Sequence, residues 1–348
     1  MVYVDDDSDS VHDADPVILR NLIQQESENS ADWLSDNRLC VAGDKTKLLV
    51  IGTRQLRNQK LNDTEMKITV DGQEVVETGS EKLLGVVLNN ELTWKAHLYG
   101  DEDNEGLVPQ LSKRVGILKQ LAKYMSKQRL KQFASGIFYS KLSYCLPVFG
   151  NVLGLEEYKE ENNRYTSYTT SDNHRLQVIQ NKVNRLLTGA RYDTPTSELL
   201  KKTDSLSVQQ MIAFQTILMT FKIQKFKKPV YLAERLEIRP SIRNLRGGAS
   251  VNQPNSSLSI KKEGFICRGQ ALMNKLDLPL RKETSIDVFK IGLRDWVKKN
   301  IEVKPKPRFQ TFQSRIRRPP PAPPQQRPPA TPTRNMITNY FMPQARQT

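Results

Sequence analysis

Two adjacent carboxylates near the start of the chain, Asp5 and Asp6, are the residues whose possible chemistry is easiest to define. Carboxylates this close raise one another's pKa, so a cation is needed to hold both of them ionised. Mg²⁺ takes hard oxygen ligands and, between protein carboxylates and substrate phosphates, supports nucleotidyl transfer. The alternative interpretation is a solvated acidic N-terminus, because Asp7 and Asp9 follow directly.

The order of the motifs that follow favours the first interpretation. Tyr3-Val4-Asp5-Asp6 resembles the active-site motif of reverse transcriptases, and the next hundred residues resemble non-LTR (LINE-type) retrotransposon enzymes. Three more segments follow in the same order as in that family. They are Trp33-Leu34, Lys45-Thr46-Lys47, and Leu84-Gly85-Val86 with Leu92-Thr93-Trp94. A looser resemblance continues to about residue 235.

The resemblance implies a role for each residue of these motifs. Asp5 and Asp6 would hold Mg²⁺, and Tyr3 would lie near the primer end. Lys45 or Lys47 would donate a proton to the pyrophosphate leaving group. RNA template and DNA primer would be the partners.

Two departures from the family pattern limit this expectation. The family needs a further catalytic carboxylate and a fingers region, both upstream of the motif, and the chain as given has no residues for them. We therefore expect no polymerase activity from this chain alone. The polar run Asp7-Ser8-Asp9-Ser10 also replaces the apolar returning strand that is common in the family.

Composition points to a partly folded, basic protein. The 348 residues are enough for two domains, but only 37% are hydrophobic, and the net charge is +15. That charge favours polyanions such as nucleic acid or an anionic membrane surface. Three scattered cysteines indicate neither a disulfide framework nor a zinc site. No membrane-spanning run is present in the sequence, and we expect an intracellular protein of cytoplasm and nucleus.

The first hundred residues are expected to combine small strands with a helix. Asp15 and Pro16 predict the start of a helix over about 16–37, followed by a buried strand over Lys45–Gly52. Asp71-Gly72 predicts a tight hairpin between Lys67–Val70 and Glu74–Val76, and Lys82–Leu88 predicts one further strand. By resemblance, residues 1–98 are the back half of a polymerase palm.

A run of basic residues without acidic ones follows an acidic loop at 100–106. From Gly106 to Leu155 there is no Asp or Glu, and apolar residues from Leu111 to Met125 recur at helical spacing. Ser126 is expected to cap a second helix that buries Leu130, Phe133, Ile137 and Leu142. We predict phosphate contacts for six residues of this run, Lys113, Arg114, Lys119, Lys123, Lys127 and Lys131. An ordinary solvated helix face is the alternative.

The rest of the ordered chain is predicted to be helical. We expect a loop over Glu156–Asn173, then a helix over His174–Leu187 closed by Gly189, and helices over Thr196–Leu200 and Leu206–Phe226. A last pair is predicted at Gly264–Leu276 and Ile286–Lys299. By resemblance, residues 99–235 are a thumb-like region, and 236–303 form a C-terminal helical region. His12, His97 and His174 are expected to be structural or exposed.

The final segment, residues 304–348, has the composition of a disordered tail. Beyond Glu302 it carries eleven of the nineteen prolines and no acidic residue. It is a possible ligand for SH3- or WW-type domains. Ile337, Tyr340 and Phe341 resemble the peptide that docks replication factors on the sliding clamp, although Arg334 stands where that motif has glutamine.

The sequence therefore predicts an α+β fold, with a partial palm of small antiparallel sheet plus helix, a helical thumb-like region and a proline-rich tail. Two functions stay open. One is a truncated RNA-directed DNA polymerase, inactive alone, and the other is a non-catalytic nucleic-acid-binding or adaptor protein.

Overall fold

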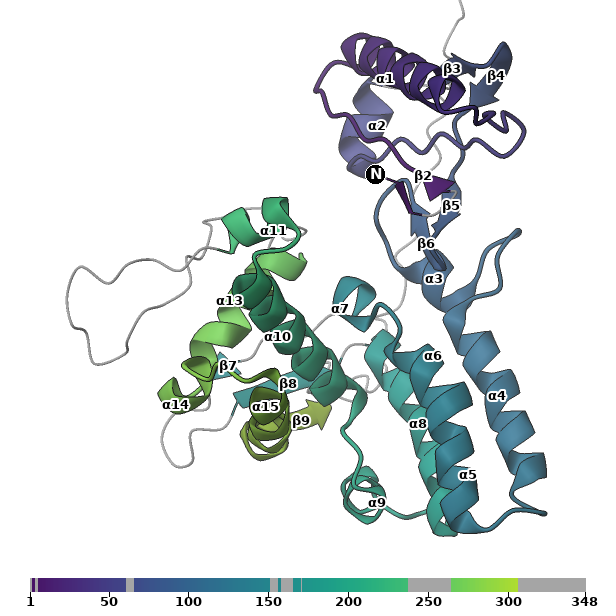
Figure 1. Cartoon of the computed structure of the whole chain (residues 1–348). Helices are drawn as coiled ribbons and strands as arrows, with labels where there is room; N and C mark the ends of the chain where they lie inside the picture. The colour runs from purple at the N-terminus through teal and green to yellow at the C-terminus, as the bar shows by residue number, and fades with distance from the viewer. Residues whose placement is uncertain are drawn as a thin grey trace, which may run out of the picture. The chain divides into compact units, whose positions relative to one another are not determined.

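The computed structural model describes residues 2–3, 6–60, 66–150, 156–157, 165–169, 171–236 and 264–305 (Figure 1). The fold is α+β, as expected, with small sheets in the first hundred residues and mainly helices after them. The predicted tail, with Ile337, Tyr340 and Phe341, lies outside the described residues apart from its first two positions, which belong to strand β9 (Ile301–Pro305).

The predicted first helix is confirmed as α1 (Pro16–Asp36), with Asp15 accepting a hydrogen bond from the backbone N–H of Val17 at 2.8 Å. It packs on the hairpin β3 (Lys67–Val70) and β4 (Gln73–Val76), whose turn at Asp71-Gly72 is also confirmed. Gln24 of α1 covers the outer edge of β3. Its side-chain amide accepts from the N–H of Thr69 at 2.8 Å and donates to the Thr69 carbonyl at 2.9 Å, as a neighbouring strand would.

The predicted strand Lys45–Gly52 is wrong. The segment is extended and buries Leu48 and Val50, but its ladder is one bridge between Leu48 and Glu77. The reason is helix α2 (Arg54–Lys60), which was not predicted from the sequence. Its Arg57 donates to the Val50 carbonyl at 2.6 Å and pairs with Glu77 at 2.6 Å, so a side chain takes an acceptor that a strand would use.

The predicted single strand Lys82–Leu88 is a hairpin of β5 (Ser80–Leu83) and β6 (Val86–Asn89). The turn residues Leu84 and Gly85 have φ of 46° and 82°. Two positive φ values give the turn a twist that matches paired strands, and leucine rarely adopts one. Because leucine is rare at a turn position with positive φ, the sequence pattern predicted one continuous strand.

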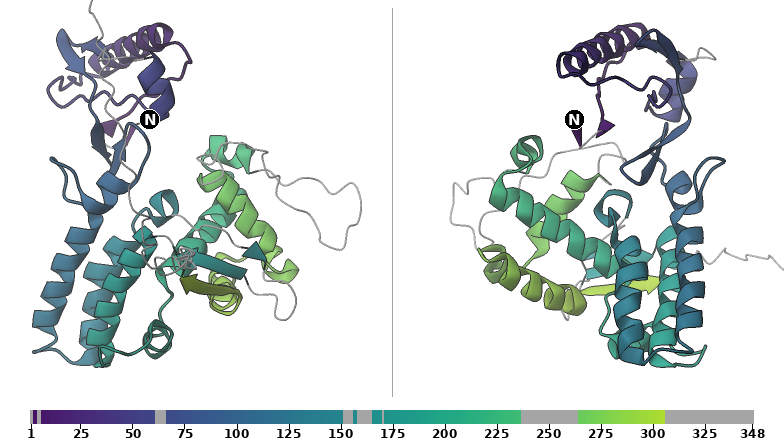
Figure 2. Two further views of the ribbon diagram at one scale, coloured as in Figure 1. Left: turned by 180° about the vertical axis from the view of Figure 1, so that it is seen from behind. Right: turned by 45° about the vertical axis from the view of Figure 1, so that its right-hand side comes forward.

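The basic run forms α4 (Leu107–Leu121) and α5 (Lys127–Ala134), which lie side by side with α8 (Ser171–Thr188) (Figures 1 and 2). Ser126 caps α5 as predicted. The predicted long second helix is interrupted by a π-helical turn, η1 (Ser135–Tyr139), before α6 (Ser140–Ser143) and α7 (Leu146–Phe149). Phe133, expected in the core, is 45% exposed.

The π-helical turn keeps the buried residues of this segment on one face. Leu130, Ala134, Phe138 and Leu142 are at most 2% exposed and recur at intervals of four. At about 100° per residue, that spacing would spread them over about 120° of a regular α-helix. The wider turn removes this drift. It also frees backbone carbonyls, and Ile137 oxygen accepts a hydrogen bond from Arg114.

The predicted loop Glu156–Asn173 contains strands β7 (Glu156–Glu157) and β8 (Tyr165–Thr169), and its last residues belong to α8. β8 pairs with β7 antiparallel and with β9 in parallel. The helix predicted at His174–Leu187 therefore starts three residues earlier, and Gly189 ends it with φ of 69° as expected.

Side-chain amides of α8 fasten the segments around it. Gln177 accepts from the N–H of Val208 at 2.9 Å, and Gln180 donates to the Leu206 carbonyl at 2.8 Å. Asn181 donates to Thr196 at 2.8 Å, and Asn184 accepts from the Tyr139 hydroxyl at 2.6 Å. The polar residues of this helix thus have a structural role, because buried polar groups need partners.

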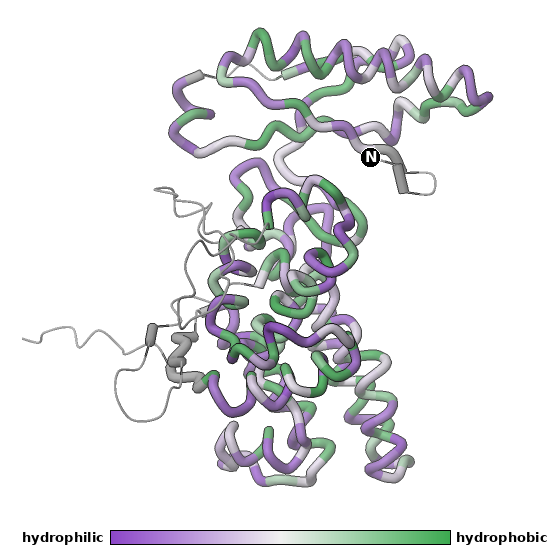
Figure 3. The backbone as a smooth tube through the Cα atoms, turned by 60° about the vertical axis from the view of Figure 1, so that its left-hand side comes forward, coloured by the Kyte–Doolittle hydropathy of each residue, from purple (hydrophilic) through white to green (hydrophobic). Residues whose placement is uncertain are grey.

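Helix α10 (Val208–Phe226) is the centre of the C-terminal part. Hydrophilic and hydrophobic residues alternate along the backbone of the described chain (Figure 3). Helix α10 packs against α7, α8, α11 (Val230–Arg235), α13 (Phe265–Lys275) and α15 (Ile286–Asn300). Its buried residues belong to three apolar clusters, through Ile212, Ile217 and Ile223 respectively. Other short helices in the described ranges are α3 (Lys95–Tyr99), α9 (Thr196–Thr203) and α14 (Leu278–Arg281).

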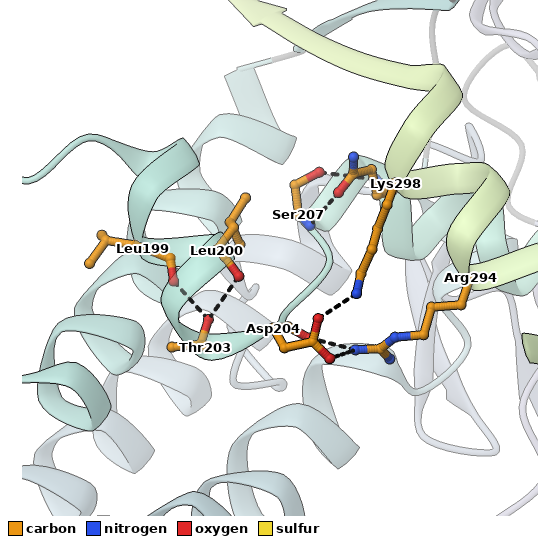
Figure 4. Close-up of polar contacts among 8 residues, drawn as sticks. Leu199, Leu200, Thr203, Asp204, Ser207, Arg294 and Lys298 are labelled. Atoms are coloured by element: carbon orange, nitrogen blue, oxygen red, sulfur yellow. Dashed lines mark hydrogen bonds and ion pairs between the residues drawn. The ribbon is translucent and has the colours of Figure 1, made fainter.

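An ion-pair group joins α9 to α15. Asp204, which follows α9 with φ of 52°, pairs with Lys298 at 2.5 Å and with Arg294 at 3.1 Å (Figure 4). These contacts, mainly the hydrogen bond from Lys298, lower the pKa of Asp204. The next residues start α10 with a reciprocal cap, in which Ser207 and Gln210 each bond the other's backbone N–H.

Candidate nucleic-acid interface

One end of the unit formed by α4, α5 and α8 gathers basic and aromatic residues. The α4–α5 turn and the segment after α8 both leave the unit at this end (Figures 1 and 2). We call this surface the basic end. Its residues are Lys119, Lys123, Tyr124, Lys127, Arg129, Arg191 and Tyr192. The apolar residues of α4 and α5 determine this placement, because burying Leu111, Leu118 and Leu130 turns the lysines outward.

Lys127 fixes the two helix ends together. Its ammonium donates to the Thr188 carbonyl at 3.4 Å, at the last residue of α8. A cation is favourable there because helix C-termini carry partial negative charge. The contact holds the start of α5 beside the end of α8, so residues of the α4–α5 turn and the residues after Gly189 belong to one surface.

Two tyrosines at the basic end are almost fully exposed. Tyr124 is 86% exposed and Tyr192 is 91% exposed. The guanidinium of Arg185 lies 5.7 Å from the centre of the Tyr192 ring. Exposed aromatic rings beside cations are the combination that binds single-stranded nucleic acid, since the rings stack on bases and the cations contact phosphates. Tyr192 was not predicted as a binding residue, and its one sequence signal is its neighbour Arg191.

The six basic residues predicted to contact phosphate fall into two groups. Lys119, Lys123 and Lys131 are exposed and have no ion-pair or hydrogen-bond partner within the described ranges. The other three have partners in the chain. Lys113 pairs with Glu105 at 2.8 Å, Arg114 donates to the Ile137 carbonyl, and Lys127 donates to Thr188. Glu105 lies one residue before the acid-free run, which is why the charge pattern missed that pair.

Of the Tyr-x-Asp-Asp motif, the structure describes Tyr3 and Asp6, which lie opposite each other in a small antiparallel pair of strands, β1 (Val2–Tyr3) and β2 (Asp6–Asp7). Asp5 lies outside the described residues. Just after β2, Asp9 accepts a hydrogen bond from Ser30 of α1 at 2.6 Å. Lys45 and Lys47 are exposed, and Lys45 lies in a turn whose N–H groups bond the Ala42 carbonyl.

His97 is a structural residue, in agreement with the sequence interpretation, while His12 and His174 are exposed. Its Nδ1 accepts from the N–H of Val87 at 3.3 Å, and its ring packs on Phe149 with centroids 4.6 Å apart. Burial, and next the charge of Lys141, lowers the pKa of His97 to about 4. The imidazole is therefore neutral at physiological pH.

In the described part of the chain, no group of three or more His, Cys, Asp or Glu side chains is arranged to hold a metal ion. Nor is any helix there long and apolar enough to cross a membrane. Comparisons with protein-family models, curated proteins and solved structures found no match to this chain.

Proposed function

We propose that this chain binds single-stranded nucleic acid through the basic end, without reading its sequence. The observation that carries the proposal is the pair of exposed rings, Tyr124 and Tyr192, beside the cations of the basic end. Within the described residues, the ion pair found among these cations joins Arg191 to Asp193 at 3.5 Å. Lysine contacts to phosphate carry no base information, so binding would be tolerant of sequence and strongly dependent on salt.

A binding assay with a labelled single-stranded oligonucleotide tests this proposal. Lys119→Ala with Lys123→Ala removes two phosphate contacts, and we expect the slope of log affinity against log salt to fall by about 1.4. Lys290→Ala with Lys299→Ala is the matched control, since both lysines are exposed on α15. Equal effects of the two double variants would show that net charge alone binds the oligonucleotide.

Tyrosine variants separate stacking from charge. Tyr124→Ala or Tyr192→Ala should each weaken binding by about 1–3 kcal/mol at constant salt, without changing the salt slope. Tyr231→Ala, at a 52% exposed tyrosine close in sequence to Lys227 and Lys228, should have no effect. Unchanged affinity in the first two variants would refute the stacking part of the proposal.

A second proposal concerns Asp5 and Asp6. We infer that they derive from the metal site of a reverse transcriptase, and the antiparallel pairing of Tyr3 in β1 with Asp6 in β2 supports this, because the motif that these residues resemble is carried on a strand–turn–strand. Mg²⁺ held by the two carboxylates would neutralise negative charge on a substrate phosphate. RNA template, DNA primer and the palm and thumb assignments belong to this proposal.

Metal binding by the purified chain tests the second proposal. Mn²⁺ is a paramagnetic substitute for Mg²⁺, and we expect it to broaden the NMR signals of β1 and β2 at low concentration. Asp5→Asn with Asp6→Asn should abolish this broadening, whereas Asp44→Asn, an exposed carboxylate elsewhere, should not. Loss of primer extension in a longer parent protein carrying the same two changes would support the polymerase origin, and templated synthesis by this chain alone would contradict the expected inactivity.

A further inference from the structure

Lys141 is a half-buried cation without an acidic partner. It lies in α6, and no carboxylate pairs with it among the residues that the structure describes. None is available nearby in sequence, because residues 106–155 contain no Asp or Glu. Partial burial of an ammonium group without counter-charge is unfavourable, and buried charges in proteins are normally paired.

Two more cations are held beside Lys141 by the fold. Arg114 of α4 donates to the carbonyl of Ile137, four residues before Lys141 and one helical turn away. The hydroxyl of Tyr144 donates to the Leu84 carbonyl at 2.6 Å, which fixes the β5–β6 turn against the end of α6. Lys82, two residues before Leu84, is thereby brought to the same place.

The electrostatics agree with this arrangement. The pKa of Lys141 is lowered by burial first, and then by the charges of Arg114 and Lys82. Glu81 does not offset these charges, because side chains alternate across a strand and that of Glu81 lies on the opposite face of β5 from Lys82. Three cations from three elements thus repel one another, and the fold holds them in position.

We propose that Lys82, Arg114 and Lys141 form a binding site for a phosphate group. A phosphate has up to two negative charges and several acceptor oxygens, so it can bond two ammonium groups and a guanidinium together. Binding converts the repulsion between the three cations into attraction to a shared anion. This site is separate from the basic end and does not depend on nucleic-acid binding there.

Thermal unfolding with added pyrophosphate, at ionic strength balanced with sodium chloride, tests the proposal. The midpoint of the wild-type protein should rise and then saturate as pyrophosphate is added, because a ligand that binds only the folded state stabilises it. Lys141→Met keeps most of the side-chain length and should abolish the saturable rise. Lys290→Met, at an exposed lysine of α15, should leave it unchanged.

The unliganded variants separate a binding role from a structural one. Without pyrophosphate, Lys141→Met should unfold at the same temperature as the wild type or at a higher one, because it removes repulsion. A lower midpoint would show that Lys141 has a stabilising partner within the chain, and it would overturn the proposal. Absence of a saturable rise in the wild type, or an equal rise in Lys141→Met, would also overturn it.

The phosphate can come from free phosphate or from a nucleic-acid chain, and binding assays distinguish the two. If nucleic acid supplies it, an oligonucleotide with a 5′-phosphate should bind Lys141→Met several-fold more weakly than wild type. If free phosphate or pyrophosphate supplies it, oligonucleotide binding should be equal in both proteins while the pyrophosphate response is lost. The Tyr124→Ala variant should keep the full pyrophosphate response, so failure of this site and failure of the proposed function are distinguishable.

Discussion

At the scale of single residues, His97 shows how burial converts a titratable group into a packing residue. Its exposed fraction is 6%, its Nδ1 accepts the N–H of Val87, and its pKa is about 4 rather than the ordinary 6.5. Charging the ring in the folded protein would remove a hydrogen-bond acceptor and place a second cation near Lys141. The folded state therefore resists protonation in the pH range where the unfolded chain accepts a proton.

This difference predicts a loss of stability on mild acidification. Above pH 6.5, His97 is neutral in both the folded and the unfolded state. Between pH 6.5 and about pH 4, His97 takes up a proton in the unfolded state but stays neutral in the folded state. The free energy of unfolding should therefore fall by about 2 kcal/mol between pH 7 and pH 5 from this residue. Urea titrations at both pH values measure it. His97→Gln, which keeps an acceptor, should remove this part of the pH dependence, and a variant at exposed His12 should not.

Gly269 is a second residue whose identity is determined by packing. A Cβ atom at this position of α13 would lie 2.3 Å from the hydroxyl oxygen of Thr220 in α10. Gly269→Ala should lower the free energy of unfolding by about 1–3 kcal/mol, despite alanine's better helix propensity. Adding Thr220→Ala should restore part of the loss in a double-mutant cycle. Gly116→Ala in α4, where nothing lies within 4 Å, should stabilise by about 1 kcal/mol.

At the scale of elements, the π-helical turn η1 corrects a mismatch between residue spacing and helix geometry. With the present spacing of four residues, a wider helical turn is needed to place four buried residues on one face, namely Leu130, Ala134, Phe138 and Leu142. Deleting Gly136 shortens one interval to three residues. The four would then lie within about 60° of one another on a regular α-helix.

We therefore expect the deletion of Gly136 to preserve cooperative unfolding. The deletion of Gly116 is a matched control, because both glycines have open space beside them. Removing Gly116 from α4 rotates Leu118 by about 100° away from Leu111, and should abolish the cooperative transition. Circular dichroism during heating distinguishes the two outcomes. Equal destabilisation by both deletions would contradict this account of the π-helical turn.

The elements also show how far the sequence predicts this fold. Helices α1, α8, α10, α13 and α15 and the β3–β4 hairpin were predicted, because their caps, glycines and apolar periods are local signals. The Lys45–Gly52 strand and the β5–β6 hairpin were predicted wrongly, since a side-chain contact of Arg57 and a leucine with positive φ decide them. At the candidate interface, the exposed lysines could be predicted from the helical periodicity. The position of Tyr192 could not, because it depends on the packing that places the end of α8 beside α5.

At the scale of the whole chain, a net charge of +15 makes the few carboxylates that join distant segments important for stability. Asp204 pairs with Arg294 and Lys298, about ninety residues later. Asparagine tolerates the positive φ of this position, so Asp204→Asn tests the charge alone.

Asp204→Asn should lower the urea midpoint at pH 7 and in low salt. Because the pKa of Asp204 is lowered from 3.8, the difference from wild type should be present above pH 3.8 and disappear as the pH falls below it. High salt should also reduce the difference, because the pair is exposed. Glu198→Gln, which removes an exposed pair within α9, should have the smaller effect. A difference that persists at low pH would indicate a role other than charge.

Helix α10 has a consequence for the synthesis of this protein. Its Ile217 and Phe221 pack with Phe289 and Leu293 of α15, which follow in the chain more than sixty residues later. At about 5–20 residues per second, translation leaves that apolar surface without its covering helix for roughly 4–15 seconds. A nascent chain paused in this interval offers a binding surface to molecular chaperones, and a message that ends before α15 should yield an aggregation-prone product.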